Sequence, residues 1–150
     1  NWYDELKPLA ADEHMNMGFW HCILEVRAAV SKVLEALRAD KTIGSSLDAD
    51  VTLYVDAELK ALLDTLGDEL RFVLITSAAQ VKLLDEADSS CIEASACDKT
   101  MHIRAVASQA AKCVRCWHHR EDIGHDKDHP ELCGRCVENV AGEGEHRRFA

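Results

Sequence analysis

The sequence predicts an α+β protein that ends in a small metal-binding module. Three observations lead to this prediction: an amphipathic helical pattern near the beginning, short apolar segments separated by turn-forming residues in the middle, and two closely spaced cysteine pairs near the end. With 150 residues, of which 47% are hydrophobic, the chain is long enough to bury the core of one domain or of two small ones. We therefore expect one compact body with a metal-stabilised appendage.

The first predicted element is a helix from about Glu13 to Ala39. Its apolar residues recur in alternating steps of four and three, the period of one buried helix face; they are Phe19, Ile23, Val26, Val30, Val33 and Leu37. A stripe this narrow packs against neighbouring helices, and the chain offers few of them. We therefore interpret the helix as part of a helical bundle. The missing partners and the absence of an initiating Met suggest a segment of a larger protein.

A connector over residues 40–46, with Gly44 and two serines, ends this helix and sets the first predicted boundary. The middle of the chain is then predicted to be a small α+β domain. Its elements, in order, are a strand at 51–55, a helix at 57–66 that ends at Gly67 in a left-handed cap, a helical turn at 70–75 begun by Asp68, and strands at 81–84 and 101–107. The run at 70–75 would also suit a strand, and a flexible excursion is predicted between the last two strands.

Two cysteine pairs near the end carry the strongest chemical signal. Cys113 and Cys116 are followed by Cys133 and Cys136 in a C-x2-C-x16-C-x2-C pattern. Two such knuckles present four sulfurs tetrahedrally, and a site closed by four thiolates leaves no position for water. We therefore predict one structural zinc ion per chain and no catalysis at the metal. Gly134 supports this, because a knuckle turns sharply and glycine accepts the dihedral angles required.

Other assignments of the cysteines remain open at this stage. The same four residues could form a redox dithiol, two local disulfides or an iron site of the same geometry. Histidines of the intervening loop could replace one cysteine; they are His118, His119, His125 and His129. Three further cysteines have no assigned role: Cys22, Cys91 and Cys97.

Net charge argues against a general nucleic-acid binder, because 27 acidic and 17 basic residues give a formal charge of −10. The acidic excess lies in residues 1–111, with 19 acidic and 10 basic side chains, whereas residues 112–150 carry 8 and 7. Arginines near the cysteines could still form a phosphate-binding face, or else an ordinary solvated tail: Arg115, Arg120, Arg135, Arg147 and Arg148. Trp117 could stack on a base or cover the metal site against the body.

The sequence shows no nucleophile–base arrangement, glycine-rich phosphate loop or carboxylate dyad, so we predict no catalytic residues. It has no apolar run of membrane-spanning length, and its first residues do not resemble a signal or transit peptide. These features predict a soluble, cytoplasmic protein without a membrane partner.

Taken together, several segments resemble the C-terminal region of bacterial isoleucyl-tRNA synthetases. The resemblance rests on residues 112–118 and 132–140 around the cysteines and on the ending at 142–150. It extends upstream through Phe19 and Trp20 and through residues 38–49 and 67–74, whereas the surroundings of Cys91 and Cys97 match no pattern of that family. Formamidopyrimidine-type DNA glycosylases have a related finger, but their N-terminal catalytic proline and β-sandwich are absent here, and no DNA partner is expected.

The resemblance implies three parts: the end of a helical anticodon-binding domain at 1–46, a small junction domain at 47–110 and a zinc finger at 111–150. The parent enzyme is a class I ligase that attaches isoleucine to its tRNA with ATP. The HIGH-type and KMSKS-type motifs are absent from this sequence, so the segment should be non-catalytic, with ATP bound only in the catalytic domain of the parent.

The implied partners are isoleucine tRNA and the remainder of the synthetase chain. Candidate tRNA-binding residues are Arg38, Lys41, Arg115, Trp117, Arg135, Arg147 and Arg148. The alternative is a purely structural zinc module that docks on the synthetase without contacting RNA.

Overall fold

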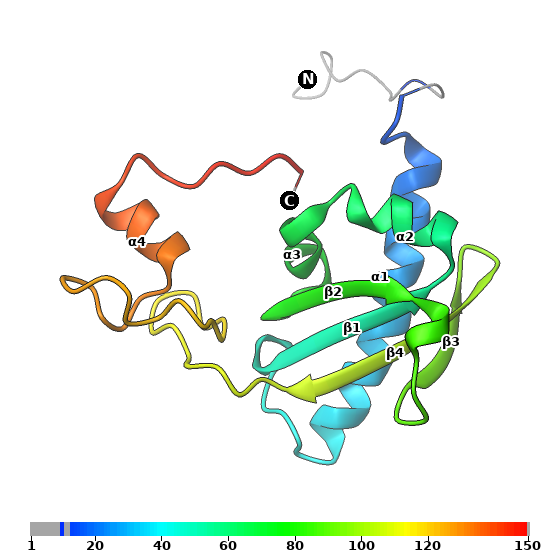
Figure 1. Ribbon diagram of the computed structural model, residues 1–150, viewed down its shortest axis with the longest axis horizontal. Helices are drawn as coiled ribbons and strands as arrows, with labels where there is room; N and C mark the ends of the chain where they lie inside the picture. Colours follow the sequence, from blue (N-terminus) through cyan, green and yellow to red (C-terminus); the bar gives the residue numbers. More distant parts are fainter. Residues whose placement is uncertain (1–9, 11–12, 150) are drawn as a thin grey trace, which may run out of the picture.

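The computed structural model describes residue 10 and residues 13–149. Figure 1 shows two regions. In the first, which we call the body (residues 13–110), one long helix lies along a twisted sheet; the second, which we call the metal module (residues 111–149), lies to one side of it. The long helix, α1, spans Met17–Ala39, and the module contains α4 at Gly134–Ala141. The expected α+β fold with a four-cysteine finger is confirmed.

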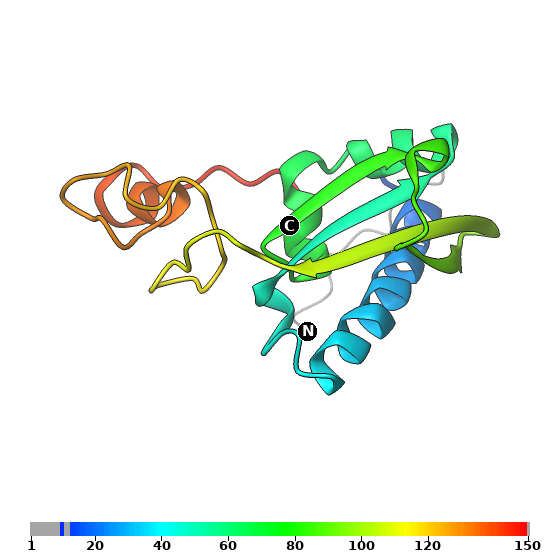
Figure 2. The same ribbon diagram turned by 60° about the horizontal axis from the view of Figure 1, so that its bottom comes forward.

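The sheet has four strands in the order β2-β1-β4-β3 (Figure 2). Its strands are β1 at Ala49–Val55, β2 at Ala78–Leu83, β3 at Ile92–Ala96 and β4 at Lys99–Ala107. β1 runs parallel to β2 and antiparallel to β4, which also pairs antiparallel with β3. Leu53 is opposite Val81 on one side and Ile103 on the other, so the apolar residues of three strands share one face.

Two helices form the crossover between the parallel strands β1 and β2. α2 spans Ala57–Asp64, and the side chain of Asp56 caps it by accepting the N–H of Leu59 at 2.7 Å. A 3₁₀ turn at Gly67–Glu69 leads into α3 at Leu70–Leu74, which confirms the predicted helical turn. Gly67 has φ +54°, as a left-handed cap requires, although α2 itself ends at Asp64. Two more 3₁₀ turns lie at Ser46–Asp48 and Leu84–Glu86.

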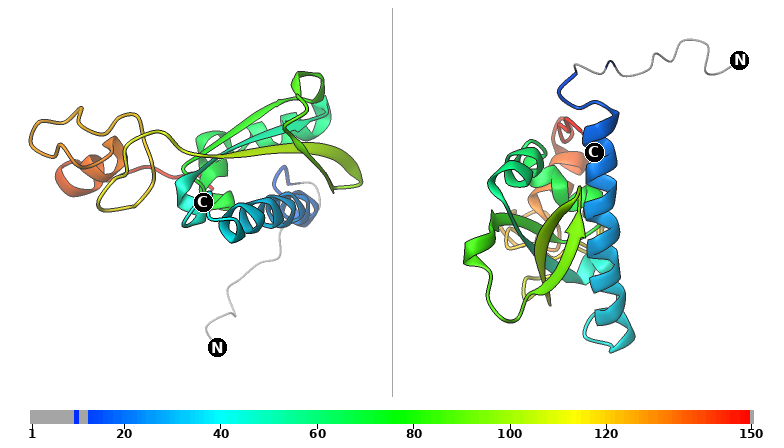
Figure 3. Two further views of the ribbon diagram at one scale, coloured as in Figure 1. Left: turned by 90° about the horizontal axis from the view of Figure 1, so that it is seen from below. Right: turned by 90° about the vertical axis from the view of Figure 1, so that its right-hand side faces the viewer.

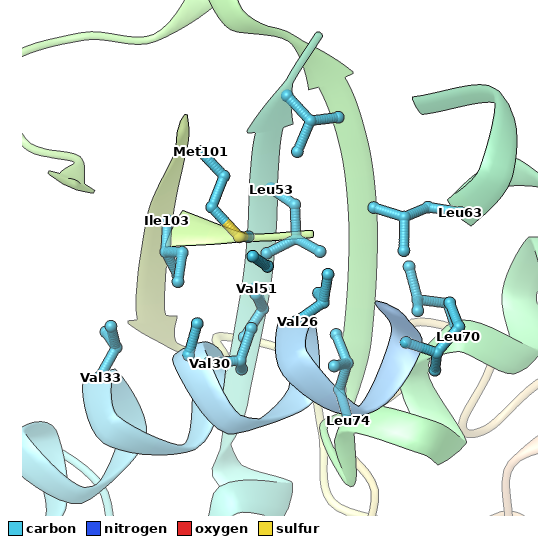
Figure 4. Packing of buried hydrophobic residues seen from close by; sticks show 14 of the residues in the cluster. Val26, Val30, Val33, Val51, Leu53, Leu63, Leu70, Leu74, Met101 and Ile103 are labelled. Atoms are coloured by element: carbon cyan, nitrogen blue, oxygen red, sulfur yellow. The ribbon is translucent and has the colours of Figure 1, made fainter. Parts of the chain in front are cut away.

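The helix stripe is buried against the sheet, and the prediction that it lacks partners within the chain is wrong. Val26, Val30 and Val33 point at strand residues such as Leu53 and Ile103 (Figure 4). The two views in Figure 3 show α1 lying along one face of the sheet. Alternate residues of β1 supply the opposing surface, because strand side chains point to the two faces in turn. A sheet therefore covers a stripe for which neighbouring helices were expected.

The structure differs from the sequence prediction most at the start of α1 and between β2 and β4; β2 and β4 also begin two to three residues earlier than predicted, at Ala78 and Lys99. α1 begins at Met17 rather than Glu13, because the side chain of Asn16 accepts the N–H of Phe19 at 3.0 Å and caps the helix there. The predicted flexible excursion contains β3, which forms a hairpin with β4. Cys97 and Asp98 make this turn with φ values of 56° and 57°, as a tight two-residue hairpin requires. Neither residue is a glycine, so the turn carries only a weak sequence signal.

The predicted domain boundaries at residues 46 and 110 remain predictions. Residues of α1 and of the sheet belong to one cluster of buried side chains, while the metal module has its own small cluster. The first part of the predicted 1–46 unit lies outside the described residues. None of the described helices is long and apolar enough to traverse a bilayer.

Candidate metal centre

The first cysteine pair lies in a tight turn held by backbone hydrogen bonds. Lys112 and His119 form an antiparallel bridge at its base, and the N–H of Cys113 donates to the carbonyl of His118 at 2.9 Å. The N–H of Trp117 donates to the carbonyl of Cys113 at 2.9 Å and closes the turn. This hairpin places Cys113 and Cys116 on the same side, facing the second pair.

The second pair is positioned by the start of α4. Cys133 immediately precedes the helix and Cys136 lies in its first turn, so both sulfurs point back toward the first knuckle. The N–H of Cys133 donates to the Sγ of Cys113 at 3.4 Å, which joins the two knuckles directly. Half-buried Ile123 and Leu132 pack on the cluster and shield it from solvent.

Among the described residues, these four cysteines form a group whose sulfur atoms all lie within 4.8 Å of one another. The Sγ atoms of Cys116 and Cys133 are 3.6 Å apart. A tetrahedral site with Zn–S bonds of about 2.3 Å has sulfur–sulfur edges of roughly 3.8 Å. Cys113, Cys133 and Cys136 are buried and Cys116 is half-buried. The donor set therefore fits a tetrahedral metal ion coordinated by four sulfurs, such as zinc or iron.

The electrostatics of the four thiols also favour a cation. Burial raises the pKa of Cys133 to about 12 and raises that of Cys136. Burial opposes ionisation of Cys113 too, but backbone N–H donors outweigh it and lower its pKa to about 6. One thiolate is thus prepared by the fold, while the thiols of Cys133 and Cys136 need a nearby positive charge to ionise. Metal binding supplies that charge.

Arg115 lies beside the thiol cluster rather than away from it. Its Nη1 donates to the Sγ of Cys136 at 3.6 Å, so its charge faces the excess negative charge that four thiolates would carry. Arg135, at the matching position of the second knuckle, pairs with Glu145 at 3.1 Å and also faces the Cys116 thiol. Both matching arginines therefore lie beside the sulfur atoms, and Arg135 has a carboxylate partner in addition.

Gly134 suits its position for a different reason from the one predicted. It is the first residue of α4 and has no left-handed φ; the left-handed residue in this module's knuckles is Trp117, with φ +65°. A Cβ at Gly134 would approach the Oδ2 of Asp122 to 2.9 Å. That carboxylate accepts the N–H of Gly134 at 3.1 Å and lies at the positive end of α4. Glycine therefore permits a close approach and not an unusual dihedral angle.

The loop histidines do not join the sulfur cluster. His118 is buried, and its Nδ1 lies 3.2 Å from the carbonyl oxygen of Cys116. Its ring packs edge-on to the ring of Phe72, with 5.9 Å between the two ring centroids. Burial, helped by the nearby charge of Arg71, lowers its pKa and favours the neutral ring. His119 faces the body instead, with its Nδ1 2.7 Å from the carbonyl of Ala110. His125 and His129 are likewise outside the cluster.

Comparisons with known proteins agree with this geometry. The family model described as "Zinc finger found in FPG and IleRS" matches residues 111–139. Curated proteins called isoleucine–tRNA ligase match 99% of the chain, with 54% identity in Alkalilimnicola ehrlichii, 55% in Thioalkalivibrio sulfidiphilus and 52% in Klebsiella pneumoniae. The chain is homologous to a segment of isoleucine–tRNA ligases. It spans 16% of the length of each of these relatives.

The match to isoleucine–tRNA ligases extends far beyond the finger. The finger model by itself covers two protein classes, whereas the ligase relatives match the body as well as the metal module. The resemblance inferred from the sequence motifs is therefore confirmed, including the part upstream of the cysteines.

The candidate tRNA-binding residues fall into separate groups. Trp117 is 62% exposed, so it does not cover the metal site against the body. Arg147 pairs with Glu145 at 3.1 Å, and its guanidinium lies 4.1 Å from the centre of the Phe72 ring. Arg38 and Lys41 lie at the end of α1, at the bottom of Figure 1, away from the metal module. The structure thus gathers Arg115, Trp117, Arg135, Arg147 and Arg148 around the module and its tail and leaves the other two apart.

Several residues that organise this region were not predicted. Phe72 packs against His118 and three arginines of the module, its tail and α3, and Asp48 contacts both sides of the first knuckle. Cys22 and Cys97 form a disulfide between α1 and the β3–β4 turn, with their Cα atoms 5.2 Å apart. Apart from the contact between Phe72 and its neighbour Arg71, these contacts join residues more than 40 positions apart, so no local motif marks them.

Proposed function

We propose that this chain is the C-terminal, tRNA-contacting segment of an isoleucine–tRNA ligase and that it binds one structural zinc ion through Cys113, Cys116, Cys133 and Cys136. The larger cytoplasmic protein would attach isoleucine to its tRNA with ATP, and this segment would be non-catalytic. Residues 1–46 would end the anticodon-binding domain, and residues 47–110 would join it to the finger. The partners would be isoleucine tRNA and the rest of the ligase chain.

The observation that carries the RNA-contacting role is the conformation of Trp117. A large aromatic side chain in the left-handed region costs roughly 1–2 kcal/mol, and this residue also leaves most of its surface in water. The backbone of Trp117 closes the turn, which glycine would do without this cost, and the exposed indole adds little packing. A tryptophan at this position is understandable if the indole is presented to a partner, and base stacking on an exposed aromatic ring contributes about 1–3 kcal/mol.

The arginines support the proposal unequally. The side chain of Arg148 is exposed, and Arg115 is exposed beside the metal centre. An open groove of about 700 Å³ between α3, α4 and the tail contains five arginines, but six carboxylates line the same groove. Its charge is nearly balanced, so it lacks the surplus of positive charge typical of a phosphate-binding surface. We therefore assign the RNA contact chiefly to Trp117 and Arg115, which do not line this groove, with Arg135, Arg147 and Arg148 contributing less.

The test is binding of isoleucine tRNA by the full-length ligase carrying Trp117→Gly. Glycine relieves the backbone strain, so the variant should keep its zinc and its stability while binding tRNA roughly tenfold more weakly. Val114→Ala is the matched control, because Val114 is exposed on the same knuckle and is aliphatic. Unchanged tRNA affinity in Trp117→Gly would remove the indole from the interface.

A second candidate function is a structural module that docks on the ligase without contacting RNA. It is favoured by the arginines that pair within the chain, such as Arg135 and Arg147 with Glu145, and by the acidic excess of residues 1–111. The two functions differ in one simple measurement. If the module is only structural, the zinc-loaded 150-residue chain should not bind tRNA even at low salt, where phosphate contacts are strongest.

A further inference from the structure

The metal module meets the body at a network centred on one carboxylate, that of Asp48. Asp48 ends the 3₁₀ turn before β1, and its side chain is 22% exposed. Its Oδ1 accepts from the Nζ of Lys112 at 2.9 Å and lies 3.3 Å from the Nε2 of His119. Lys112 and His119 are the bridged pair at the base of the first knuckle. One carboxylate therefore contacts both sides of the hairpin that holds Cys113 and Cys116.

The other atoms of Asp48 tie it firmly to the body. Its Oδ2 accepts the N–H groups of Ser45 and Gly44 at 2.8 and 3.2 Å, and its carbonyl accepts the N–H of Ser108 at 2.8 Å. Ser108 follows β4 directly, at the beginning of the connection to the module. The carboxylate is thus oriented from one side by the backbone and presented to the module on the other.

Ser77 adds a second bridge at the same junction. It is fully buried; its Oγ donates to the carbonyl of Leu47 and accepts the N–H of His119. The Nδ1 of His119 lies 2.7 Å from the carbonyl oxygen of Ala110, so both ring nitrogens lie beside oxygen atoms of the body or of the connection. The knuckle is therefore held by charge-assisted bonds and not by apolar packing alone.

We infer that Asp48 is a positioning residue that fixes the orientation of the metal module on the body. The metal determines the shape of the module, and Asp48 determines the direction in which the module faces. Trp117 lies two residues from His119 in the same knuckle, so a change at Asp48 redirects the indole without touching it. Only the RNA consequence of this inference rests on the proposed function; the orientation itself does not.

The test uses the zinc-loaded chain with Asp48→Ala and Asp48→Asn. Asp50→Asn is the control, because Asp50 is nearby on β1 and makes none of these bonds. Hydrogen exchange at the amides of Ser108 and His119 should become at least tenfold faster in both Asp48 variants. Exchange within β1 and β4, and the zinc content, should match the wild type.

Each outcome has a definite meaning. Exchange within twofold of the wild type at Ser108 and His119 would overturn the inference. Loss of zinc in both Asp48 variants would overturn it too, since the residue would then support the metal site itself. Faster exchange with zinc retained supports it, and tRNA affinity of the same variants in the full-length ligase separates the two proposals. Faster hydrogen exchange at Ser108 and His119 together with unchanged tRNA affinity would contradict the RNA-contacting role but leave the positioning role of Asp48 intact.

Discussion

The body and the metal module are stabilised in different ways. In the body, α1 and the sheet share a continuous cluster of fully buried side chains such as Val26, Leu53 and Ile103. In the module, the buried cluster contains three cysteines with Cys116, Ile123 and Leu132 packed against them. The apolar area of the module is too small to fold it, so a metal ion must supply the missing free energy. We therefore expect most perturbations to change the stability of one region without changing that of the other.

Removal of the metal should have the largest effect, and only on the module. Structural zinc contributes on the order of 10 kcal/mol to such sites, so a strong chelator should unfold residues 111–149. The body should keep its helix and sheet, because none of its core residues ligates the metal. Hydrogen exchange at the amide of Cys113 in the module and at that of Leu53 in the sheet reports the two regions separately. Simultaneous unfolding of both would break the comparison.

Reduction of the Cys22–Cys97 disulfide should affect only the body. The disulfide closes a loop of 75 residues between α1 and the β3–β4 turn, and such a loop corresponds to about 4 kcal/mol in the chain-entropy model. Denatured, metal-free protein should show five reactive thiols when oxidised and all seven when reduced. The predicted cytoplasmic location would favour the reduced form.

Cys91→Ser serves as the control for the disulfide, because Cys91 is a free cysteine outside both groups. Cys91→Ser should leave the free energy of unfolding of the body unchanged. Cys97→Ser should lower that free energy to the value of the reduced protein. Seven thiols in protein kept under oxidising conditions would contradict the disulfide.

Truncation of a buried core side chain should have the next largest effect on stability. Leu53 is fully buried between β2 and β4, so Leu53→Ala should lower the free energy of unfolding of the body by about 2–5 kcal/mol. Zinc affinity should change little. Leu24→Ala, at a position 55% exposed on α1, is the matched control in urea unfolding. An equal loss in both variants would mean that the core does not lie where the structure places it.

The smallest effect concerns the junction between the two regions and depends on pH. Burial opposes ionisation of Asp48, but hydrogen bonds from Lys112, Ser45 and His119 outweigh it and lower its pKa from 3.8 to about 2. Because the folded-state pKa is depressed, the stabilisation is complete above about pH 4 and is lost as the pH falls toward 2. Its size is about 2 kcal/mol.

The stability difference between wild type and Asp48→Asn checks this prediction. It should be equal at pH 7 and pH 5 and should shrink between pH 4 and pH 2. If the stability difference persists unchanged at pH 2.5, the negative charge of the Asp48 carboxylate is not its cause.

Local patterns predicted much of the fold. The stripe of α1, the strand β1 and the helical turn α3 follow from apolar period, β-branched residues and turn chemistry, and the cysteine spacing alone located the metal centre. β3 was missed because its sequence, Ile-Glu-Ala-Ser-Ala, has little β propensity and is a strand only through pairing with β4. The partner of the helix stripe was wrong for a related reason, since an apolar stripe does not say whether a helix or a sheet covers it.

The clustering of the four cysteines was predicted, and their surroundings were predicted less well. Four sulfurs at knuckle spacing require no long-range information, whereas the contacts of Asp48, Ser77 and Phe72 depend on how the two regions meet. The same holds for the arginines, because a guanidinium that pairs with Glu145 and one that faces solvent look alike in sequence.

Metal analysis by mass spectrometry on the purified chain shows directly whether the four cysteines hold one zinc ion. We predict one equivalent of zinc in the wild type and in Cys91→Ser, and none retained in Cys113→Ser. Iron in place of zinc, or a folded wild-type module without metal and with four reactive thiols, would contradict the account.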